Sequence, residues 1–265
     1  MTAALQLTGE RVVVAGDWHG VRTAGIDVIT SAASAGARVV LHVGDLNVPA
    51  AGTAPSIVKS FNQACTRTGT VLLVTPGNHD NWDRIESSPL DESGFHVLAR
   101  HVRALPRGAR FEIAGRRFGA LGGAISVHTR RVPGETWWPQ ERITEEHVRL
   151  LGTAPLDVIL THDAPAGIPL TSRLNPPAEL VAEADELRAR LLRAVQATRP
   201  RLAFCGHWHT RRIHELHTDD ETITTVHVLN REHTVGNAVV LDLPTMTVAP
   251  LLTSGVPAEA SETRR

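Results

Sequence analysis

The sequence predicts an α/β fold in which short buried strands alternate with helices around a parallel sheet. Three observations predict this class. Five short apolar runs are spaced along the chain, segments with helical periodicity separate several of them, and a group of polar residues follows each run. Among the 265 residues, 42% are hydrophobic and 21% are charged. This composition provides a packed core and excludes a disordered or fibrous chain.

The five apolar runs are predicted to be strands. Each run is short, rich in aliphatic and β-branched residues, and nearly continuous in apolar character, which is typical of a strand buried on both faces. The runs are residues 11–15, 38–43, 70–75, 156–161 and 201–205. His42 lies inside the second run, and we expect it to be a core histidine with satisfied hydrogen bonds.

Residues 22–36, 53–65 and 178–198 are predicted to be helices because their apolar residues recur at helical spacing. Gly36 is the expected C-cap of the first helix, and Thr53 is a candidate N-cap of the second. The order strand, helix, strand, helix, strand indicates parallel pairing with right-handed crossovers in the first part of the chain.

Two later regions are predicted to be antiparallel. Residues 111–121 alternate on both sides of Ala114-Gly115, which indicates a hairpin, and residues 211–243 indicate a meander. No linker separates these regions from the rest. We therefore expect one domain over residues 1–252, followed by a flexible tail over residues 253–265.

Charge, hydropathy and cysteine content limit the functional classes. The 27 Lys and Arg and 28 Asp and Glu residues give a net charge of −1, so no global basic field favours long nucleic acid or an acidic membrane surface. The apolar runs are far shorter than a membrane span, and the first residues show no signal-peptide pattern. Cys65 and Cys205 form no disulfide framework, which fits a reducing compartment. We expect a cytoplasmic protein.

Side chains with metal-binding chemistry follow all five predicted strands. The carboxyl ends of parallel strands lie along one edge of a sheet, where the loops form a binding crevice, so these side chains should converge. Glycines beside them allow a close approach of the backbone. The residues are Asp17, His19, Asp45, Asn78, His79, Asp80, His162, Asp163, His207 and His209.

A converging group of imidazoles and carboxylates requires a partner. Charged imidazoles are costly to bury, and neutral imidazoles would lack hydrogen-bond partners. A divalent cation removes both problems, because neutral imidazole nitrogens and carboxylate oxygens become its ligands. There are too many ligands for one tetrahedral zinc, but seven of them with a solvent species fill two sites if one carboxylate bridges. Ordinary turn chemistry, which favours Asp, Asn and Gly, does not require so many histidines.

In their order and spacing these residues resemble the calcineurin-like metallophosphoesterase superfamily. The blocks are Asp17-x-His19, Gly44-Asp45, Gly77-Asn78-His79-Asp80, His162 and Gly206-His207-x-His209. The resemblance implies a metallo-dependent phosphatase-like fold, a four-layer α/β/β/α sandwich of two mixed β-sheets flanked by helices. It also implies two divalent metal ions, with Mn favoured and Fe, Zn and Ni as alternatives.

The resemblance also implies a role for each residue. Asp17, His19 and His209 would hold one metal, Asn78, His162 and His207 would hold the other, and Asp45 would bridge them. Two cations about 3.5–4 Å apart can clamp a phosphate and lower the pKa of a bridging water. The bridging hydroxide would attack phosphorus in line, and His79 would protonate the leaving group as a general acid.

One position departs from the phosphoprotein phosphatase branch of the superfamily. That branch carries a second Asp shortly after the bridging Asp, as a partner for the catalytic His, whereas this chain has Val48 there. The difference argues against a Ser/Thr protein phosphatase and leaves open what orients His79. Asp80 is adjacent to His79, but adjacency does not require its side chain to reach the imidazole.

The sequence offers three candidate residues for contacts with the substrate. His128 and Arg130 follow a glycine pair in a loop that could lie over the metals, and Arg211 follows the last metal block. An arginine there could bind phosphate in a bidentate manner. The alternative for each of these residues is a solvated loop or strand end. Trp137-Trp138 could line the rim of the cleft or cover an edge of the core.

We expect a metal-dependent phosphoric ester hydrolase whose substrate is a small phosphomonoester or phosphodiester. One alternative is a nuclease acting on short nucleic acid, since a local patch of arginines could replace a global basic field. A second alternative is a non-catalytic interaction module on the same fold. Loss of metal ligands would indicate such a module, and no ligand is missing from this sequence.

Overall fold

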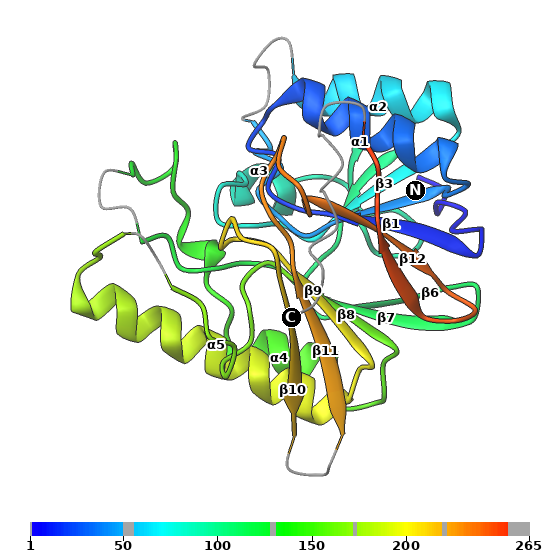
Figure 1. Ribbon diagram of the computed structural model, residues 1–265. Coiled ribbons are helices and arrows are strands. Elements are labelled where there is room, and N and C mark those ends of the chain that lie inside the picture. The colour runs from blue at the N-terminus through cyan, green and yellow to red at the C-terminus, as the bar shows by residue number, and fades with distance from the viewer. Residues whose placement is uncertain (1, 50–55, 128–130, 172–173, 219–221, 254–265) are drawn as a thin grey trace.

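The computed structural model describes residues 2–49, 56–127, 131–171, 174–218 and 222–253. Within these residues the strands form two sheets that pack face to face (Figure 1). In spatial order, the first sheet contains β13 (Thr247–Pro250), β12 (Ala238–Asp242), β1 (Arg11–Ala15), β2 (Val39–His42), β3 (Val71–Val74), β5 (Val102–Ala104) and β4 (His96–Ala99). The second contains β10 (Arg212–His217), β11 (Ile223–Val228), β9 (Leu202–Cys205), β8 (Val158–Thr161), β7 (Arg116–Leu121) and β6 (Ala109–Ile113).

Helices cover the outer face of each sheet (Figure 1). The first sheet is covered by α1 (Arg22–Ser34) and α2 (Ile57–Thr68). The second is covered by α4 (Glu145–Leu151) and α5 (Ala178–Thr198). Two short helices, α3 (Trp82–Glu86) and a 3-10 helix (Pro139–Glu141), lie in the connections.

The alternation of side chains along β1 shows how the layers form. Val13 packs in the cluster between the first sheet and its helices, together with Phe61 of α2. Its neighbours Val12 and Val14 point to the opposite face, as successive strand residues do, and pack between the sheets with Phe204 of β9. A third cluster joins β8 and β9 to α5. The result is the four-layer α/β/β/α sandwich of two mixed sheets that the family resemblance implied.

All five predicted strands are present, but they belong to two sheets. β1, β2 and β3 pair in parallel through the crossover helices α1 and α2, as predicted. β8 and β9 pair in parallel in the second sheet. The predicted polar residues therefore converge from the carboxyl ends of two facing sheets rather than along the edge of one.

The antiparallel predictions are confirmed in one region and wrong in the other. β6 and β7 form the predicted hairpin around Ala114-Gly115, with φ of 48° and 74° at the turn. Residues 211–243 are not a meander, because β10 and β11 form a hairpin but β12 pairs antiparallel with β1 in the first sheet. β12 is apolar on both faces, with Val239 and Leu241 between the sheets and Ala238 toward the helices. A strand of that kind gains more by burial beside β1 than at the edge next to the polar β10.

The second predicted helix is displaced along the chain. α2 begins at Ile57 and ends at Thr68, where Gly69 adopts a φ of 67° and donates its amide to the carbonyl of Cys65. This left-handed glycine ends the helix three residues beyond the predicted end. The predicted N-cap Thr53 lies outside the described residues, as does the predicted tail from residue 254 onward.

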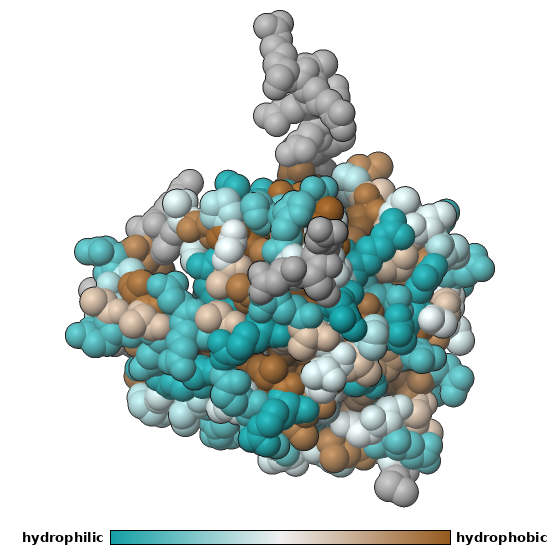
Figure 2. Space-filling view, turned by 90° about the horizontal axis from the view of Figure 1, so that it is seen from below, coloured by the Kyte–Doolittle hydropathy of each residue, from teal (hydrophilic) through white to brown (hydrophobic). Residues whose placement is uncertain are grey.

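Two further features are the length and apolar character of the helices and the distribution of hydrophobic residues on the surface. Of the helices in the described part of the chain, none combines the length and apolar character needed to cross a membrane. Figure 2 shows one face of the molecule, on which hydrophilic and hydrophobic residues are intermixed. The hydrophobic areas on that face are small and separated by hydrophilic ones (Figure 2).

Candidate metal centre

The seven predicted ligands come together where the carboxyl ends of the two sheets meet. The loops after β1, β2 and β3 carry Asp17, His19, Asp45 and Asn78, and the loops after β8 and β9 carry His162, His207 and His209. Ligand atoms within 4.8 Å of one another form two groups, one of Asp17, His19, Asp45 and His209 and one of Asp45, His162 and His207. Asp45 belongs to both groups, as expected for a bridging ligand.

Asn78 joins the second group through His162. Its Oδ1 lies 3.0 Å from Nε2 of His162, and Oδ1 of Asp45 lies 3.2 Å from the same nitrogen. Nδ1 of His162 donates to the carbonyl of Val43 at 2.8 Å, which leaves the Nε2 lone pair directed at these oxygens. Lone pairs that converge in a buried space repel unless a proton or a cation lies between them. The donor set therefore fits a divalent cation.

The first group has the same character. Nε2 of His19 lies 3.5 Å from Oδ2 of Asp45, and Nε2 of His209 lies 3.9 Å from Oδ1 of Asp17. The rings of His19 and His209 are edge-to-face with centroids 4.7 Å apart. The amide of His207 donates to both carboxylate oxygens of Asp17 at 2.9 and 3.1 Å. These amide hydrogen bonds fix the Asp17 carboxylate against the loop after β9.

Left-handed backbone conformations are concentrated at this centre. Five of the seven candidate ligands have φ between 42° and 66°; they are Asp17, His19, Asp45, His207 and His209. Non-glycine residues rarely adopt this region, and they persist in it when the surrounding structure holds them there. Each such turn carries a side chain that belongs to one of the two ligand groups.

Three glycines leave room that a larger residue would fill. A Cβ atom at Gly44 would lie 2.2 Å from Nδ1 of His162, and one at Gly206 would lie 2.0 Å from Oδ2 of Asp17. A Cβ at Gly77 would lie 2.3 Å from Oδ1 of Asp45. These glycines are required by close approach, which confirms the expectation drawn from their position beside the ligands.

A comparison with known protein families covers the same seven candidate ligands. The sequence profile of calcineurin-like phosphoesterases matches residues 10–211, which include all seven candidate ligands. The chain belongs to the calcineurin-like phosphoesterase family. Members of this family typically bind divalent metals, and the two groups of side chains in this calcineurin-like phosphoesterase can bind them.

Solved structures with this fold are distant in sequence. One aligns with a TM-score of 0.61 at 14% identity, covering 92% of this chain and 99% of its own. The TT1561 protein of Thermus thermophilus aligns with a TM-score of 0.57 at 13% identity, covering 91% and 97%. A dimetal phosphatase from Danio rerio aligns with a TM-score of 0.52 at 10% identity, covering 88% and 92%. At these identities the similarity shows the fold alone. No sequence among the curated proteins matches the chain.

The electrostatics of this calcineurin-like phosphoesterase also fit cation binding. Burial raises the pKa of Asp17 to about 7. Desolvation acts to lower the pKa of His162, but the nearby Asp45 carboxylate outweighs it and raises the pKa to about 10. Desolvation is likewise outweighed at His19, where the hydrogen bond to Asp45 raises the pKa to about 9. Buried carboxylates thus hold protons on adjacent imidazoles, and a bound cation would replace those protons.

His79 lies at the rim of the centre. Its side chain is 35% exposed, and its Nε2 is 4.0 Å from Oδ2 of Asp45. Its backbone amide donates to Oδ1 of Asp45 at 2.8 Å. Burial lowers the pKa of His79 to about 4. The imidazole is therefore partly exposed at the centre and belongs to neither group of ligand atoms.

The loop that carries His79 is fixed by Asp80. This buried carboxylate accepts hydrogen bonds from the amides of Val48 and Gly77, each at 2.8 Å. The side chain of Val48 is buried in the helix-side core and offers His79 no polar contact. Asp80 therefore orients the backbone of the loop rather than the imidazole, by joining the loops after β2 and β3.

A buried hydrogen-bond chain supports Asn78, and sequence reasoning did not identify it. Nδ2 of Asn78 donates to Oγ of Ser126 at 3.0 Å, and Ser126 donates to Glu141 at 2.6 Å. Arg131 donates to the carbonyl of Asn78 at 2.8 Å and also contacts Ser126. These hydrogen bonds hold the Asn78 side chain so that its Oδ1 faces the second ligand group. Trp137 donates to Glu141, so its indole serves this support, and Trp138 is buried.

The described residues give no support to the three predicted substrate contacts. His128 and Arg130 lie outside the described residues. The guanidinium of Arg211 donates to the carbonyls of Arg212 at 3.1 Å and Val228 at 3.3 Å, against the β10–β11 hairpin rather than among the candidate ligands. Both of these hydrogen bonds use Nη1 of the guanidinium.

The expectation for His42 was wrong in part. Its Nδ1 accepts from the amide of Gly44 at 3.3 Å, but its Nε2 is buried with no hydrogen-bond partner among the described residues. The ring packs edge-to-face against Trp18 at 4.4 Å, in an apolar environment. Burial lowers the pKa of His42 to about 3, so the ring stays neutral as a core residue.

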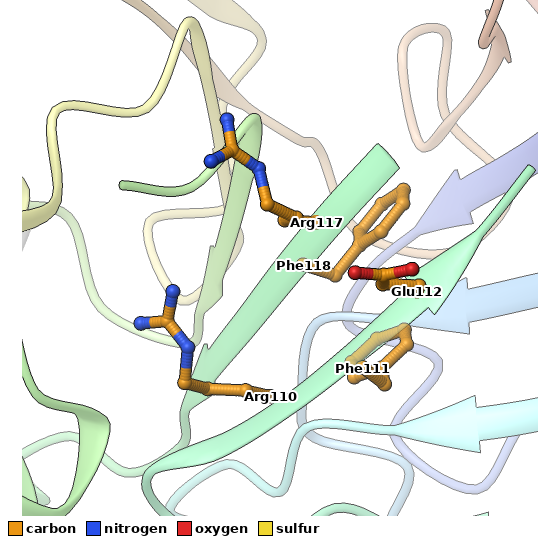
Figure 3. A pocket seen from close by; sticks show the side chains of 5 residues that line it. All are labelled: Arg110, Phe111, Glu112, Arg117 and Phe118. Carbon is orange, nitrogen blue, oxygen red and sulfur yellow. The ribbon is translucent and has the colours of Figure 1, made fainter. Parts of the chain in front are cut away.

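A pocket on the β6–β7 hairpin is separate from the metal centre, since none of the candidate ligands lines it (Figure 3). Figure 3 shows the guanidinium groups of Arg110 and Arg117 directed away from the rings of Phe111 and Phe118. Arg117 binds Asp157 through two nitrogens, and Arg110 donates to backbone carbonyls. The guanidinium groups of Arg110 and Arg117 are therefore both bound by other residues of the protein.

Proposed function

We propose that this chain is a dinuclear metal-dependent phosphoesterase that hydrolyses a small phosphomonoester or phosphodiester. The observation that carries the proposal is the pair of ligand groups that share Asp45. A single carboxylate shared between two donor sets is the arrangement expected for two cations close enough to act on one phosphate. A net charge of −1 favours a small ester over long nucleic acid.

The proposed roles follow the two groups. Asp17, His19 and His209 hold one cation, Asn78, His162 and His207 hold the second, and Asp45 holds both. When bound, the cations would polarise the phosphoryl group and supply an activated water as nucleophile. The chain's own contribution is to fix these ligands in place, through the left-handed turns, the three glycines and the hydrogen bonds to Val43 and Ser126.

His79 is the proposed general acid. Its side chain is partly exposed at the centre, with Nε2 4.0 Å from Oδ2 of Asp45, and this nitrogen would donate a proton to the leaving oxygen. A neutral imidazole acquires its proton more readily when an anionic phosphate lies beside it. Arg131, whose N–H groups hold Asn78 and Ser126, acts in the opposite direction, because its positive charge lowers the pKa of His79.

Replacement of His79 should affect substrates unequally. His79→Ala is expected to slow hydrolysis of alkyl phosphate esters by about 10²- to 10⁴-fold, because an alkoxide leaves poorly without a proton. Hydrolysis of p-nitrophenyl esters should fall much less, since p-nitrophenolate leaves unprotonated. Steady-state rates on matched alkyl and p-nitrophenyl esters measure the difference, with His217→Ala on the exposed β10 as control. An equal loss on both substrates would contradict the general-acid role.

Metal analysis combined with two model substrates tests the proposed function. Protein purified without chelator should carry close to two divalent ions per chain by elemental analysis. Metal-free protein given Mn²⁺ should hydrolyse bis-p-nitrophenyl phosphate, p-nitrophenyl phosphate, or both, and the faster substrate distinguishes a diesterase from a monoesterase. If no Mn, Fe, Zn or Ni is bound and none of these metals restores turnover, the proposal is wrong.

A further inference from the structure

The connection between β11 and β12 passes over the loop that holds Asp17 and His19. It leaves the second sheet at Leu229 and enters the first sheet at Ala238. The amide of Glu232 donates to the carbonyl of Asp17 at 3.0 Å, and the amide of Gly16 donates to the carbonyl of Asn237 at 3.3 Å. These backbone hydrogen bonds attach the connection directly to the loop after β1. The family profile ends at residue 211, so this segment lies outside the region that defines the family.

This connection places a carboxylate behind one candidate ligand. Oε2 of Glu232 lies 2.9 Å from Nδ1 of His19, and the Glu232 side chain is only 15% exposed. The opposite nitrogen of the same ring, Nε2, faces Asp45. Because Nδ1–H donates to Glu232, the Nε2 lone pair is fixed toward the first ligand group.

The equivalent position in the second group is occupied by a neutral acceptor. His162 donates its Nδ1–H to the carbonyl of Val43, not to a carboxylate. Asp163, the nearest acidic residue in sequence, accepts from the indole of Trp208 and from the amide of Ala164. The first group thus contains two carboxylates, Asp17 and the shared Asp45, and a third, Glu232, contacts its ligand His19. The second group contains Asp45 alone, and the nearby Asp163 carboxylate acts on His207 without being a member of the group.

We propose that Glu232 is a positioning residue that makes the site of Asp17, His19, Asp45 and His209 the tighter of the two cation sites. The inference rests on the proposed dinuclear centre. A carboxylate partner increases the basicity of a ligating imidazole and fixes its orientation, and loss of such a partner lowers metal affinity by about 10- to 100-fold. Additional negative charge beside the first site strengthens its attraction for a divalent cation.

Calorimetric titration of metal-free protein with Mn²⁺ tests this proposal. Wild-type protein should bind two ions with unequal affinity. Asn78→Ala should weaken the second site and leave the tighter event in place, which assigns the two events. Glu232→Ala should weaken the tighter event by about 10- to 100-fold and leave the weaker one unchanged. Glu232→Gln should lose less, because its amide oxygen still accepts from Nδ1–H without providing charge.

Two controls separate positioning from a general disturbance. His233→Ala alters the neighbouring residue of the same connection, whose imidazole contacts Thr23, and retains Glu232. Glu215→Gln removes one negative charge from the exposed face of β10. Both should bind Mn²⁺ as wild type does. Circular dichroism reports folding of each variant, and if Glu232→Ala does not fold, the titration of Glu232→Gln decides the question.

Several results would overturn the proposal. Two equivalent sites in the wild type, an unchanged tight event in Glu232→Gln and Glu232→Ala, or an equal weakening of both events would each contradict a specific role for Glu232. Failure of the wild-type protein to bind Mn²⁺ at all is a different result, since it would reject the dinuclear centre on which the inference rests.

Discussion

Asp45→Asn is expected to lower the rate of phosphate ester hydrolysis by at least about 10³-fold, equivalent to roughly 4 kcal/mol of transition-state stabilisation. Asp45 is the one residue common to both ligand groups. The substitution keeps the size of the side chain but removes its charge and replaces one carboxylate oxygen with an amide NH₂. Neither orientation of the amide presents an acceptor oxygen to both His19 and His162, so one site should lose its cation.

Kinetics and elemental analysis together measure this effect. Metal content should fall from about two ions per chain toward one or fewer, in parallel with the rate. Asp185→Asn, on the exposed side of α5, is the matched control and should retain both ions and the wild-type rate. A rate for Asp45→Asn close to that of wild type, with both ions retained, would exclude the bridging role.

The success of the sequence predictions has a local cause. Each candidate ligand lies within a few residues of the end of a short apolar strand, so finding the strand also finds the site. Val12 to Val14 and Asp17 illustrate this, since the same stretch of sequence encodes the buried strand and the turn that follows it. The division of the strands between two sheets did not affect the prediction, because the carboxyl ends of both sheets meet.

The residues that were missed act over long separations in the sequence. Glu232 is 213 positions from His19, and Ser126 is 48 positions from Asn78. An isolated Glu or Ser in a loop carries no periodicity or motif that would indicate such a contact. Their placement depends on how β12 crosses to the first sheet and how the loop after β7 folds, which are properties of the tertiary structure. The apolar character of β12 was the only available signal, and it indicated a strand but not its partner.

The close packing at Gly206 leads to the second large expected effect. Gly206→Ala should lower the hydrolysis rate by at least about 10²-fold, which is the cost of misplacing a catalytic group by about 1 Å. The backbone at Gly206 does not have a positive φ, so an alanine is not strained there by its own conformation. The loss would come from its Cβ, which would lie 2.0 Å from Oδ2 and 2.9 Å from Cγ of Asp17. Asp17 would have to move away from the amide of His207 and from the first ligand group.

Gly94→Ala is the control for this test, because the added methyl group meets no neighbouring atom while the backbone is strained. Gly94 has a φ of 78° and no atom within 4 Å of the Cβ position, so its alanine variant should lose about 1 kcal/mol of stability through backbone strain alone. Its metal content and rate should equal those of wild type. Thermal unfolding, elemental analysis and steady-state rates on both variants would separate steric displacement of Asp17 from a general loss of stability. If Gly206→Ala retains both metals and full activity, the loops can rearrange around the added methyl group. In that case the lack of a side chain at Gly206 is not what keeps Asp17 in place in the first ligand group.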